Sequence, residues 1–281
     1  MTPFKDNWIT FEERETEFLL NIGPFSQGIF QGITHAANQF RYLYDITGKS
    51  MAVPLSGGID SQSVVLAAKE SGVPFQVYSL RFNKGLNDHD LSTGIELVKS
   101  LGLTISFVDI DIIKFYTSGE HLAYVDPYKN SSPQVAALLW FYQKIAGDNI
   151  IIGTGNPIIK HLSGYSGMNN FTLFAWERFC RAKNISMIGF FLWYTAELFG
   201  SLYREVPDDL SGIEPYALKC DIYRENGFNI IPQCRKQNGF ENVKAEFFKL
   251  YPRTVDPYDT FYRYPHHDRN NKHIVVNWNT E

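Results

Sequence analysis

A glycine-rich hexapeptide with one carboxylate carries the residue types in this sequence best suited to chemistry. It reads Ser56-Gly57-Gly58-Ile59-Asp60-Ser61, and it lies between the apolar run 51–55 and the apolar-periodic run 64–68. This order predicts a strand, a tight glycine turn and a helix. The start of such a helix presents free N–H groups and the positive end of a dipole. The segment therefore predicts an anion site, above all for phosphate.

Asp60 does not suit a bare phosphate site, because its carboxylate would repel the phosphate unless a divalent cation lies between them. Mg²⁺ bound together with a nucleotide is the expected pair. The glycines Gly57 and Gly58 permit a tight turn and a close approach of the backbone to the phosphate. We therefore predict that Asp60 is both a metal ligand and a catalytic residue.

The hexapeptide resembles SGGxDS, the pyrophosphate-binding loop of the ATP-pyrophosphatase superfamily, which includes asparagine synthetases, NAD synthetases, GMP synthetases and tRNA thiolation enzymes. The resemblance implies cleavage of ATP between the α- and β-phosphates, adenylation of an oxygen, and displacement of AMP by a nucleophile. It also implies that the whole hexapeptide binds the cofactor, namely Ser56, Gly57, Gly58, Ile59, Asp60 and Ser61. The Gly-Lys-Ser/Thr ending of a Walker loop is absent from this segment.

A second glycine-containing turn follows the Ile-rich run 149–152 and adds four cofactor-binding candidates: Gly153, Thr154, Gly155 and Asn156. It resembles the GTxN segment of NAD synthetases and, more loosely, the glycine–aspartate turn of asparagine synthetases. In NAD synthetases an acidic residue three places after that Asn holds metal, whereas this chain has Ile159. The second metal-binding acid is therefore missing or supplied elsewhere. The alternative interpretation is an ordinary turn at the end of a strand.

The region 75–102 resembles the corresponding part of asparagine synthetases, in which backbone groups at a strand end meet the adenine. By that resemblance Leu80 and Arg81 are cofactor-binding candidates. An acidic helix start follows, and we expect Asp88 or Asp90 to cap this helix.

Cationic side chains are needed where negative charge develops on a departing pyrophosphate. Lys160 follows the second glycine turn, and Lys219, Arg224, Arg235 and Lys236 come late in the chain. We select Lys160, Arg235 and Lys236, together with Asp60, as the catalytic candidates. The alternative for each cation is an ordinary solvated surface charge.

Strand and helix patterns alternate along the first half of the chain. Strands are expected at 51–55, 75–80, 103–108 and 149–152, and helices at 25–44, 61–71, 88–100 and 133–146. Such alternation predicts an α/β fold with a doubly wound parallel sheet, and the resemblance makes it adenine nucleotide alpha hydrolase-like. Later helices are expected at 171–183, 187–204, 215–227 and 240–251, with a last strand at 273–278.

These patterns divide the chain into three parts. We expect an N-terminal arm at 1–24, an ATP-binding domain at 25–157, and a helical C-terminal substrate and closure region at 158–281. Ligands of open parallel sheets bind at the carboxyl ends of the strands. The two glycine turns should therefore meet at one edge of the sheet.

Composition limits the functional classes. The chain has 281 residues, 44% of them hydrophobic, and a net charge of −4, which disfavours strong nonspecific nucleic-acid binding. The three cysteines lie far apart in the sequence, which disfavours a structural zinc site and is typical of a reducing cytoplasm. The most membrane-like stretch, 185–203, contains Glu197 and is expected to be a buried helix.

The chain looks nearest to the synthetase domain of asparagine synthetases. Residue 2 is Thr, whereas a glutaminase domain would begin with Cys, so ammonia, an amine or a separate nitrogen donor should supply the nucleophile. We expect a ligase that uses ATP and Mg²⁺, acts on a small-molecule or nucleotide acceptor, has no membrane partner, and is a candidate for homodimer formation. The alternatives are a tRNA- or nucleotide-modifying enzyme, including thiolation, and a noncatalytic nucleotide-binding protein.

Overall fold

The structure is a computed structural model of the 281-residue chain. It describes residues 5–7, 9–13, 17–23, 31–128, 133–153, 170–203, 212–233, 239–250 and 273–278.

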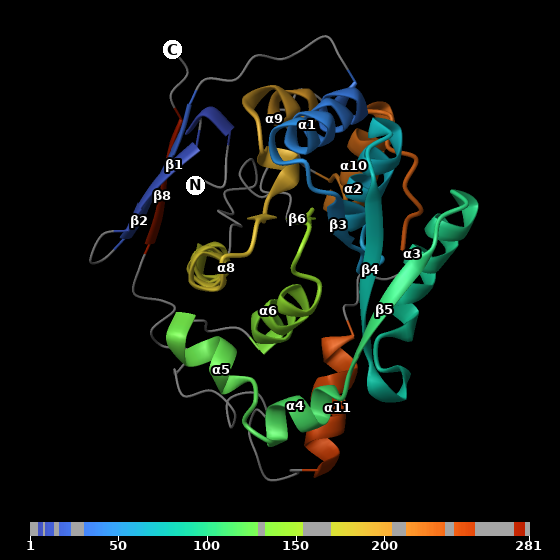
Figure 1. Cartoon of the computed structure of the whole chain (residues 1–281), viewed down its shortest axis with the longest axis vertical. Coiled ribbons are helices and arrows are strands. Elements are labelled where there is room, and N and C mark those ends of the chain that lie inside the picture. Colours follow the sequence, from blue (N-terminus) through green and yellow to red (C-terminus); the bar gives the residue numbers. More distant parts are fainter. Residues whose placement is uncertain are drawn as a thin grey trace.

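Five parallel strands form the main sheet, in the order β5-β4-β3-β6-β7 (Figure 1). Their bounds are β3 Met51–Pro54, β4 Phe75–Phe82, β5 Ile105–Ile110, β6 Asn149–Ile151 and β7 Met187–Ile188. In the central strand, Met51 pairs with Phe75 on one side and with Asn149 on the other. The predicted α/β fold with a parallel sheet is confirmed.

The strand order reverses between β3 and β6. The crossovers through α2 (Ile59–Ser71) and α3 (Asp88–Ser100) lead toward one edge, and those through α6 (Pro133–Lys144) and α8 (Asn170–Lys183) lead toward the other. Right-handed crossovers in opposite directions place the two helix pairs on opposite faces of the sheet. The sheet is therefore doubly wound. The carboxyl ends of the neighbouring strands β3 and β6 mark the switch point, where ligands of such sheets bind.

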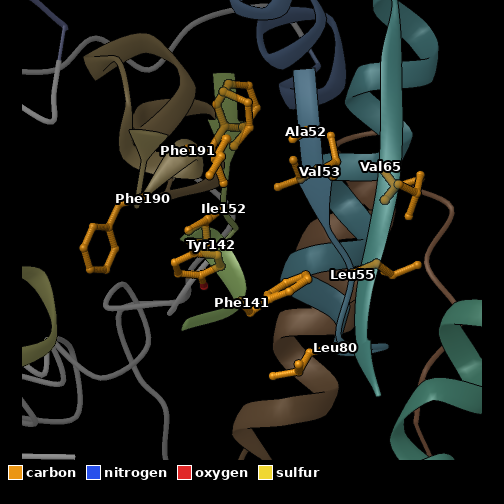
Figure 2. Packing of buried hydrophobic residues seen from close by; sticks show 14 of the residues in the cluster. Ala52, Val53, Leu55, Val65, Leu80, Phe141, Tyr142, Ile152, Phe190 and Phe191 are labelled. Atoms are coloured by element: carbon orange, nitrogen blue, oxygen red, sulfur yellow. The ribbon is translucent and has the colours of Figure 1, made fainter. Parts of the chain in front are cut away.

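The central strand is buried on both faces, as strands of doubly covered parallel sheets are. Ala52 and Val53 have no exposed surface. Figure 2 shows Tyr142 and Phe191 on one side of β3 and Val65 on the other. The strand that precedes the glycine turn is therefore firmly held by packing.

A second, three-stranded sheet lies apart from the first, on the opposite side of the molecule from α3 and β5 (Figure 1). It contains β1 Ile9–Glu13, β2 Glu17–Ile22 and β8 His273–Trp278, in the order β1-β2-β8. β2 runs antiparallel to β1 and parallel to β8. The strand expected at 273–278 is confirmed, and the N-terminal arm supplies the other two strands of this sheet.

The remaining described elements are helical: η1 Lys5–Asn7, α1 Gly32–Thr47, η2 Asn83–Gly85, α4 Ile112–Thr117, α5 Leu122–Val125, η3 Asp126–Tyr128, η4 Phe191–Trp193, α9 Ala196–Tyr203, α10 Pro215–Glu225 and α11 Phe240–Leu250. Most helices expected from the sequence match these within a few residues. No described helix is long and apolar enough to cross a membrane.

The helix expected at 187–204 is wrong over its first half. Residues 187–188 form β7, which extends the main sheet beside β6, and α9 begins at Ala196. Between them, Gly189 lies against the ring of Trp176, and a Cβ at Gly189 would come within 2.9 Å of that ring. Sheet pairing and this close contact outweigh helical periodicity here. The division of the chain at residue 157 stays a prediction, although β7 adds a strand from beyond it.

Candidate active site

The glycine turn follows β3 directly, and its two glycines are in different situations. Gly57 has φ +94°, and a Cβ there would come within 1.9 Å of the main-chain oxygen of Asp90 in α3. Gly58 has φ −66°, and the nearest atom to a Cβ there is the Ser56 Oγ at 3.5 Å. The fold therefore requires glycine at position 57, while a methyl group at position 58 would fit without a clash.

Two serine hydroxyls close the loop. The Ser56 amide donates to Ser61 Oγ at 3.2 Å, and Ser61 Oγ donates to the Gly58 carbonyl at 2.8 Å. Ile59 is buried at the start of α2. The Gly58 N–H lies 3.4 Å from Ser56 Oγ, a long contact that leaves this donor available to a stronger acceptor.

Asp60 lies in the first turn of α2 and is held by two side chains from α10. Lys219 Nζ lies 2.6 Å from Asp60 Oδ1, and the Tyr223 hydroxyl donates a hydrogen bond to the same oxygen. Burial, followed by the negative charge of Asp60, raises the pKa of Tyr223 well above its usual value. Tyr223 therefore stays protonated and acts as a donor.

Lys219 brings a positive charge to the glycine loop from a distant helix. It is 9% exposed, so this ion pair is largely shielded from water. Sequence reasoning named Lys219 among the late cations but did not select it. The signal available was its spacing from Tyr223, since residues four apart share one face of a helix.

Gly153, just after β6, lies against the first turn of α2, next to Asp60. A Cβ there would come within 2.2 Å of the main-chain oxygen of Asp60 and 2.5 Å of Val64 Cγ2. The end of β6 therefore packs tightly against the first turn of α2, as the positions of the two glycine turns predict. The other selected residues lie outside the described part of the chain: Thr154, Gly155, Asn156, Lys160, Arg235 and Lys236.

The end of β4 lies beside the loop, but its polar groups already have partners. The Leu80 carbonyl accepts from Asn87 Nδ2 and the Phe82 N–H donates to Asn87 Oδ1, each at 2.8 Å. Arg81 is exposed and makes two hydrogen bonds to Asp109, at 2.6 and 3.0 Å. The bond to Asp109 raises the pKa of Arg81 and lowers that of Asp109. The proposed adenine contacts of Leu80 and Arg81 stay a prediction.

The expected capping of α3 is wrong. Asn87 occupies the N-cap position without a side-chain cap, because its amide serves the end of β4 instead. Asp90 lies in the first turn, where its Oδ1 accepts from Gln233 Nε2 at 2.5 Å. Burial raises the pKa of Asp90 to about 7, which the bond from Gln233 partly offsets.

The segment 230–233, which we call the crossing segment, runs past the loop after α10. Gln233 reaches Asp90, and its Nε2 would lie 3.4 Å from a Cβ on Gly57. The Gln233 amide also donates to the Tyr216 hydroxyl at 2.9 Å. The crossing segment is therefore held beside the loop, and Arg235 and Lys236 come shortly after it in the sequence. No pattern in the sequence identifies Asp90 or Tyr216 as partners of this segment.

The described residues contain no group of three or more His, Cys, Asp or Glu side chains that could hold a metal by itself. Within the described part of the chain, a metal beside Asp60 would have this one carboxylate as its protein ligand, and phosphate oxygens of a nucleotide could complete its coordination. Mg²⁺ is commonly bound in this way, by one or two carboxylates and by phosphate oxygens. The contacts from Lys219 and Tyr223 both use Oδ1, so the carboxylate of Asp60 suits that role through its second oxygen.

Comparisons with known proteins gave structural likenesses alone. No family model and no curated protein matches the sequence. An NH3-dependent NAD synthetase from Campylobacter jejuni matches with TM-score 0.38 and 18% identity, covering 81% of this chain and 87% of that one. The U34-tRNA thiolase NcsA from Methanococcus maripaludis matches with TM-score 0.38 and 12% identity, covering 79% and 74%.

An NMN synthetase from Francisella tularensis matches with TM-score 0.33 and 14% identity, covering 83% of this chain and 98% of that one. At these scores the likenesses are distant.

Proposed function

We propose that this chain is an ATP-dependent ligase that forms AMP and pyrophosphate, adenylates a carboxylate, and makes an amide with ammonia or an amine. One observation carries the proposal. The glycine loop lies at the switch point of a doubly wound sheet, with Asp60 in the first turn of the following helix and Lys219 paired with it. This arrangement combines an anion-binding turn, a carboxylate and a shielded cation.

The proposed reaction has two steps, adenylation of the acceptor and displacement of AMP. A carboxylate oxygen of the acceptor attacks the α-phosphorus of ATP, and the bond from that phosphorus to the bridging oxygen breaks, so that pyrophosphate leaves with the electron pair. The nitrogen nucleophile then attacks the acyl carbon, AMP leaves with the acyl–oxygen electron pair, and the nitrogen loses a proton. The Gly58 N–H and the start of α2 bind the phosphates. Lys219 provides positive charge beside them.

Mg²⁺ fits the site with Asp60 as its protein ligand and phosphate oxygens as further ligands. When bound, it would supply charge that stabilises the departing pyrophosphate. The Asp60 carboxylate would then have two positive partners, the metal expected from the sequence and Lys219.

Several finer assignments belong to the same proposal. Lys160, Arg235 and Lys236 supply further positive charge. Arg235 and Lys236 follow, after Cys234, the crossing segment that is held against the loop. The acceptor is a small molecule or a nucleotide, the nitrogen comes from ammonia, an amine or a separate donor protein, and the chain is a candidate homodimer. The sparse cysteines favour a cytoplasmic setting.

Product analysis tests the proposal. The purified chain is incubated with radiolabelled ATP, Mg²⁺ and a panel of carboxylates with ammonium, and the nucleotide products are separated. AMP and pyrophosphate in equal amounts are expected. Formation of ADP would contradict it, and tight ATP binding with no turnover across the panel would favour a noncatalytic nucleotide-binding protein. AMP formed with tRNA but with no carboxylate would favour the tRNA-modifying alternative.

A further inference from the structure

Gln62 is a buried polar side chain beside the loop that the proposed chemistry does not use. It lies in the first turns of α2 and has no exposed surface. Its amide makes three hydrogen bonds: Nε2 donates to the Gly57 carbonyl at 2.7 Å and to the Ile231 carbonyl at 2.8 Å, and Oε1 accepts from the Ile231 N–H at 2.7 Å. Both N–H donors and the oxygen of this amide are therefore used.

The first of these bonds fixes the orientation of one peptide group. The Gly57 carbonyl and the Gly58 N–H belong to the same peptide unit, and the described chain contains no cis peptide bond. In a planar trans peptide these two groups point in opposite directions. Because Gln62 holds the Gly57 carbonyl on its buried side, the Gly58 N–H must point away from Gln62, toward Ser56 Oγ and the open side of the loop.

This orientation needs a fixed partner, because glycines flank the peptide on both sides. Glycine adopts positive and negative φ about equally well, so the peptide between Gly57 and Gly58 could rotate with little steric cost. A rotated peptide would present its carbonyl oxygen to the anion and would repel a phosphate. The bond from Gln62 therefore keeps the donor side of this peptide toward the anion.

We infer that Gln62 is a positioning residue of the glycine loop, which aims the Gly58 N–H at a bound pyrophosphate group and ties the loop to Ile231 of the crossing segment. The inference rests on the proposed function, since it assumes that the loop binds phosphates. It adds a coupling that the proposed function does not contain. The same amide holds the Gly57 and Ile231 carbonyls, so an anion that orders the loop also orders the crossing segment before Arg235 and Lys236.

The experiment uses the full chain and inorganic pyrophosphate with Mg²⁺, measured by calorimetric titration. Gln62→Met keeps the approximate size of the side chain and removes its three hydrogen bonds. The matched control is Gln76→Met, which removes a partly buried amide whose Nε2 donates to the Val77 carbonyl on β4. We expect pyrophosphate affinity to fall about ten-fold or more in Gln62→Met, because the Gly58 N–H would no longer be held toward the charged anion. In the control it should change less than about two-fold.

Hydrogen exchange separates positioning from general support of the fold. In the wild type, pyrophosphate should slow exchange of the Ile231 amide as well as that of the Gly58 amide. In Gln62→Met, the response at Ile231 should disappear while exchange in the buried strand β3 stays slow. An equal response at Ile231 in both proteins would overturn the coupling.

Gln62→Glu provides a second variant if Gln62→Met does not fold. An ionised carboxylate there would face two carbonyl oxygens, whereas the protonated acid can donate to one of them. Affinity for pyrophosphate, relative to wild type at the same pH, should therefore recover as the pH falls from 8 to 6. A constant ratio across that range would count against the inference, as would wild-type affinity in Gln62→Met. If the wild type itself binds neither pyrophosphate nor ATP, the proposed function fails along with it.

Discussion

At the scale of single residues, the two glycines of the loop separate folding from binding. Gly57 is packed against the backbone of Asp90 and has a positive φ, whereas Gly58 has ordinary backbone angles and room for a methyl group. A side chain at Gly57 must disturb α3, but a methyl group at Gly58 makes only an ordinary van der Waals contact, with Ser56 Oγ. The pair therefore allows a substitution that blocks the anion site while leaving the fold intact.

Gly58→Ala should weaken binding of a nonhydrolysable ATP analogue by about ten-fold or more, because the methyl group obstructs the approach of a phosphate to the backbone. Its thermal unfolding midpoint should stay close to that of the wild type. Gly57→Ala serves as the contrast and should cost at least about 2 kcal/mol of stability from the positive φ and the backbone clash. Wild-type affinity in folded Gly58→Ala would argue against phosphate binding at this turn.

Asp60→Asn should abolish ATP turnover while the protein remains folded. Asn keeps an oxygen that can accept from Tyr223 but loses the charge that pairs with Lys219 and suits a metal. Steady-state AMP formation is the measurement, with circular dichroism to confirm the fold. Tyr223→Phe is the matched control, because it removes one hydrogen bond to the same oxygen and keeps the ion pair. Full turnover in Asp60→Asn would contradict the assigned role.

At the scale of elements, the crossing segment joins the C-terminal half of the chain to the loop. Gln62 in α2 and Asp90 in α3 hold it at two points, and Tyr216 in α10 at a third. A segment fixed in this way can place the residues that follow it reproducibly. The next cations in sequence are Arg235 and Lys236.

Arg235→Ala or Lys236→Ala should lower the single-turnover rate of AMP formation by about ten-fold or more, the scale of losing one charge-stabilising donor. Affinity for the nucleotide should change less. Arg224→Ala is a suitable control, because Arg224 is exposed and contacts Asp221 within α10. If both substitutions leave the rate unchanged, the cations must come from Lys160, Lys219 or a partner chain.

Asp90→Asn should change how stability depends on pH. The pKa of Asp90 is raised to about 7 in the folded protein, so the folded state holds its proton over a range in which the unfolded carboxyl, with a pKa near 3.9, has lost it. The contribution of Asp90 to the stability of the wild type therefore falls as the pH rises from about 4 to 7. At pH 8 Asp90→Asn should be more stable than the wild type by roughly 1–3 kcal/mol, and the difference should shrink by pH 4.5. Denaturant unfolding at several pH values measures this; a constant difference would contradict it.

The elements nearest the loop were predictable from sequence because local signals and tertiary context agree there. The strand at 51–55, the helix after Ser61 and the helix at 88–100 all follow from apolar spacing and glycine turns. The long-range contacts were not predictable. Nothing local to Gln62 or Lys219 indicates that one meets Ile231 and the other Asp60, since each contact joins residues more than 150 positions apart.

The helix wrongly expected to begin at Met187 is also explained by a contact with a distant part of the chain. Its apolar neighbours suit a helix, but pairing with β6 decides the structure, and that pairing depends on a strand far earlier in the chain. The caps of α3 were missed because Asn87 and Asp90 both bond outside their own helix. Side chains that serve distant partners cannot be assigned from local preference.

At the scale of the whole molecule, the switch point of the sheet brings the loop and Gly153 together, and α10 completes the site from the C-terminal half. The three contributions come from separate parts of the sequence. Each is rigidly placed by a packed element rather than by a long loop. This accounts for an organised Asp60 environment within the described residues.

The strands of the small sheet are synthesised at very different times. β2 and β8 pair directly although about 250 residues separate Glu17 from His273. A ribosome adds roughly 5–20 residues per second, so β2 emerges on the order of tens of seconds before its partner. A β-hairpin forms within about 1–10 microseconds, so β1 and β2 can pair almost at once. Until β8 is synthesised, the other edge of β2 remains unpaired. Nascent chains that meet during this interval can pair along that edge, and arrival of β8 closes it.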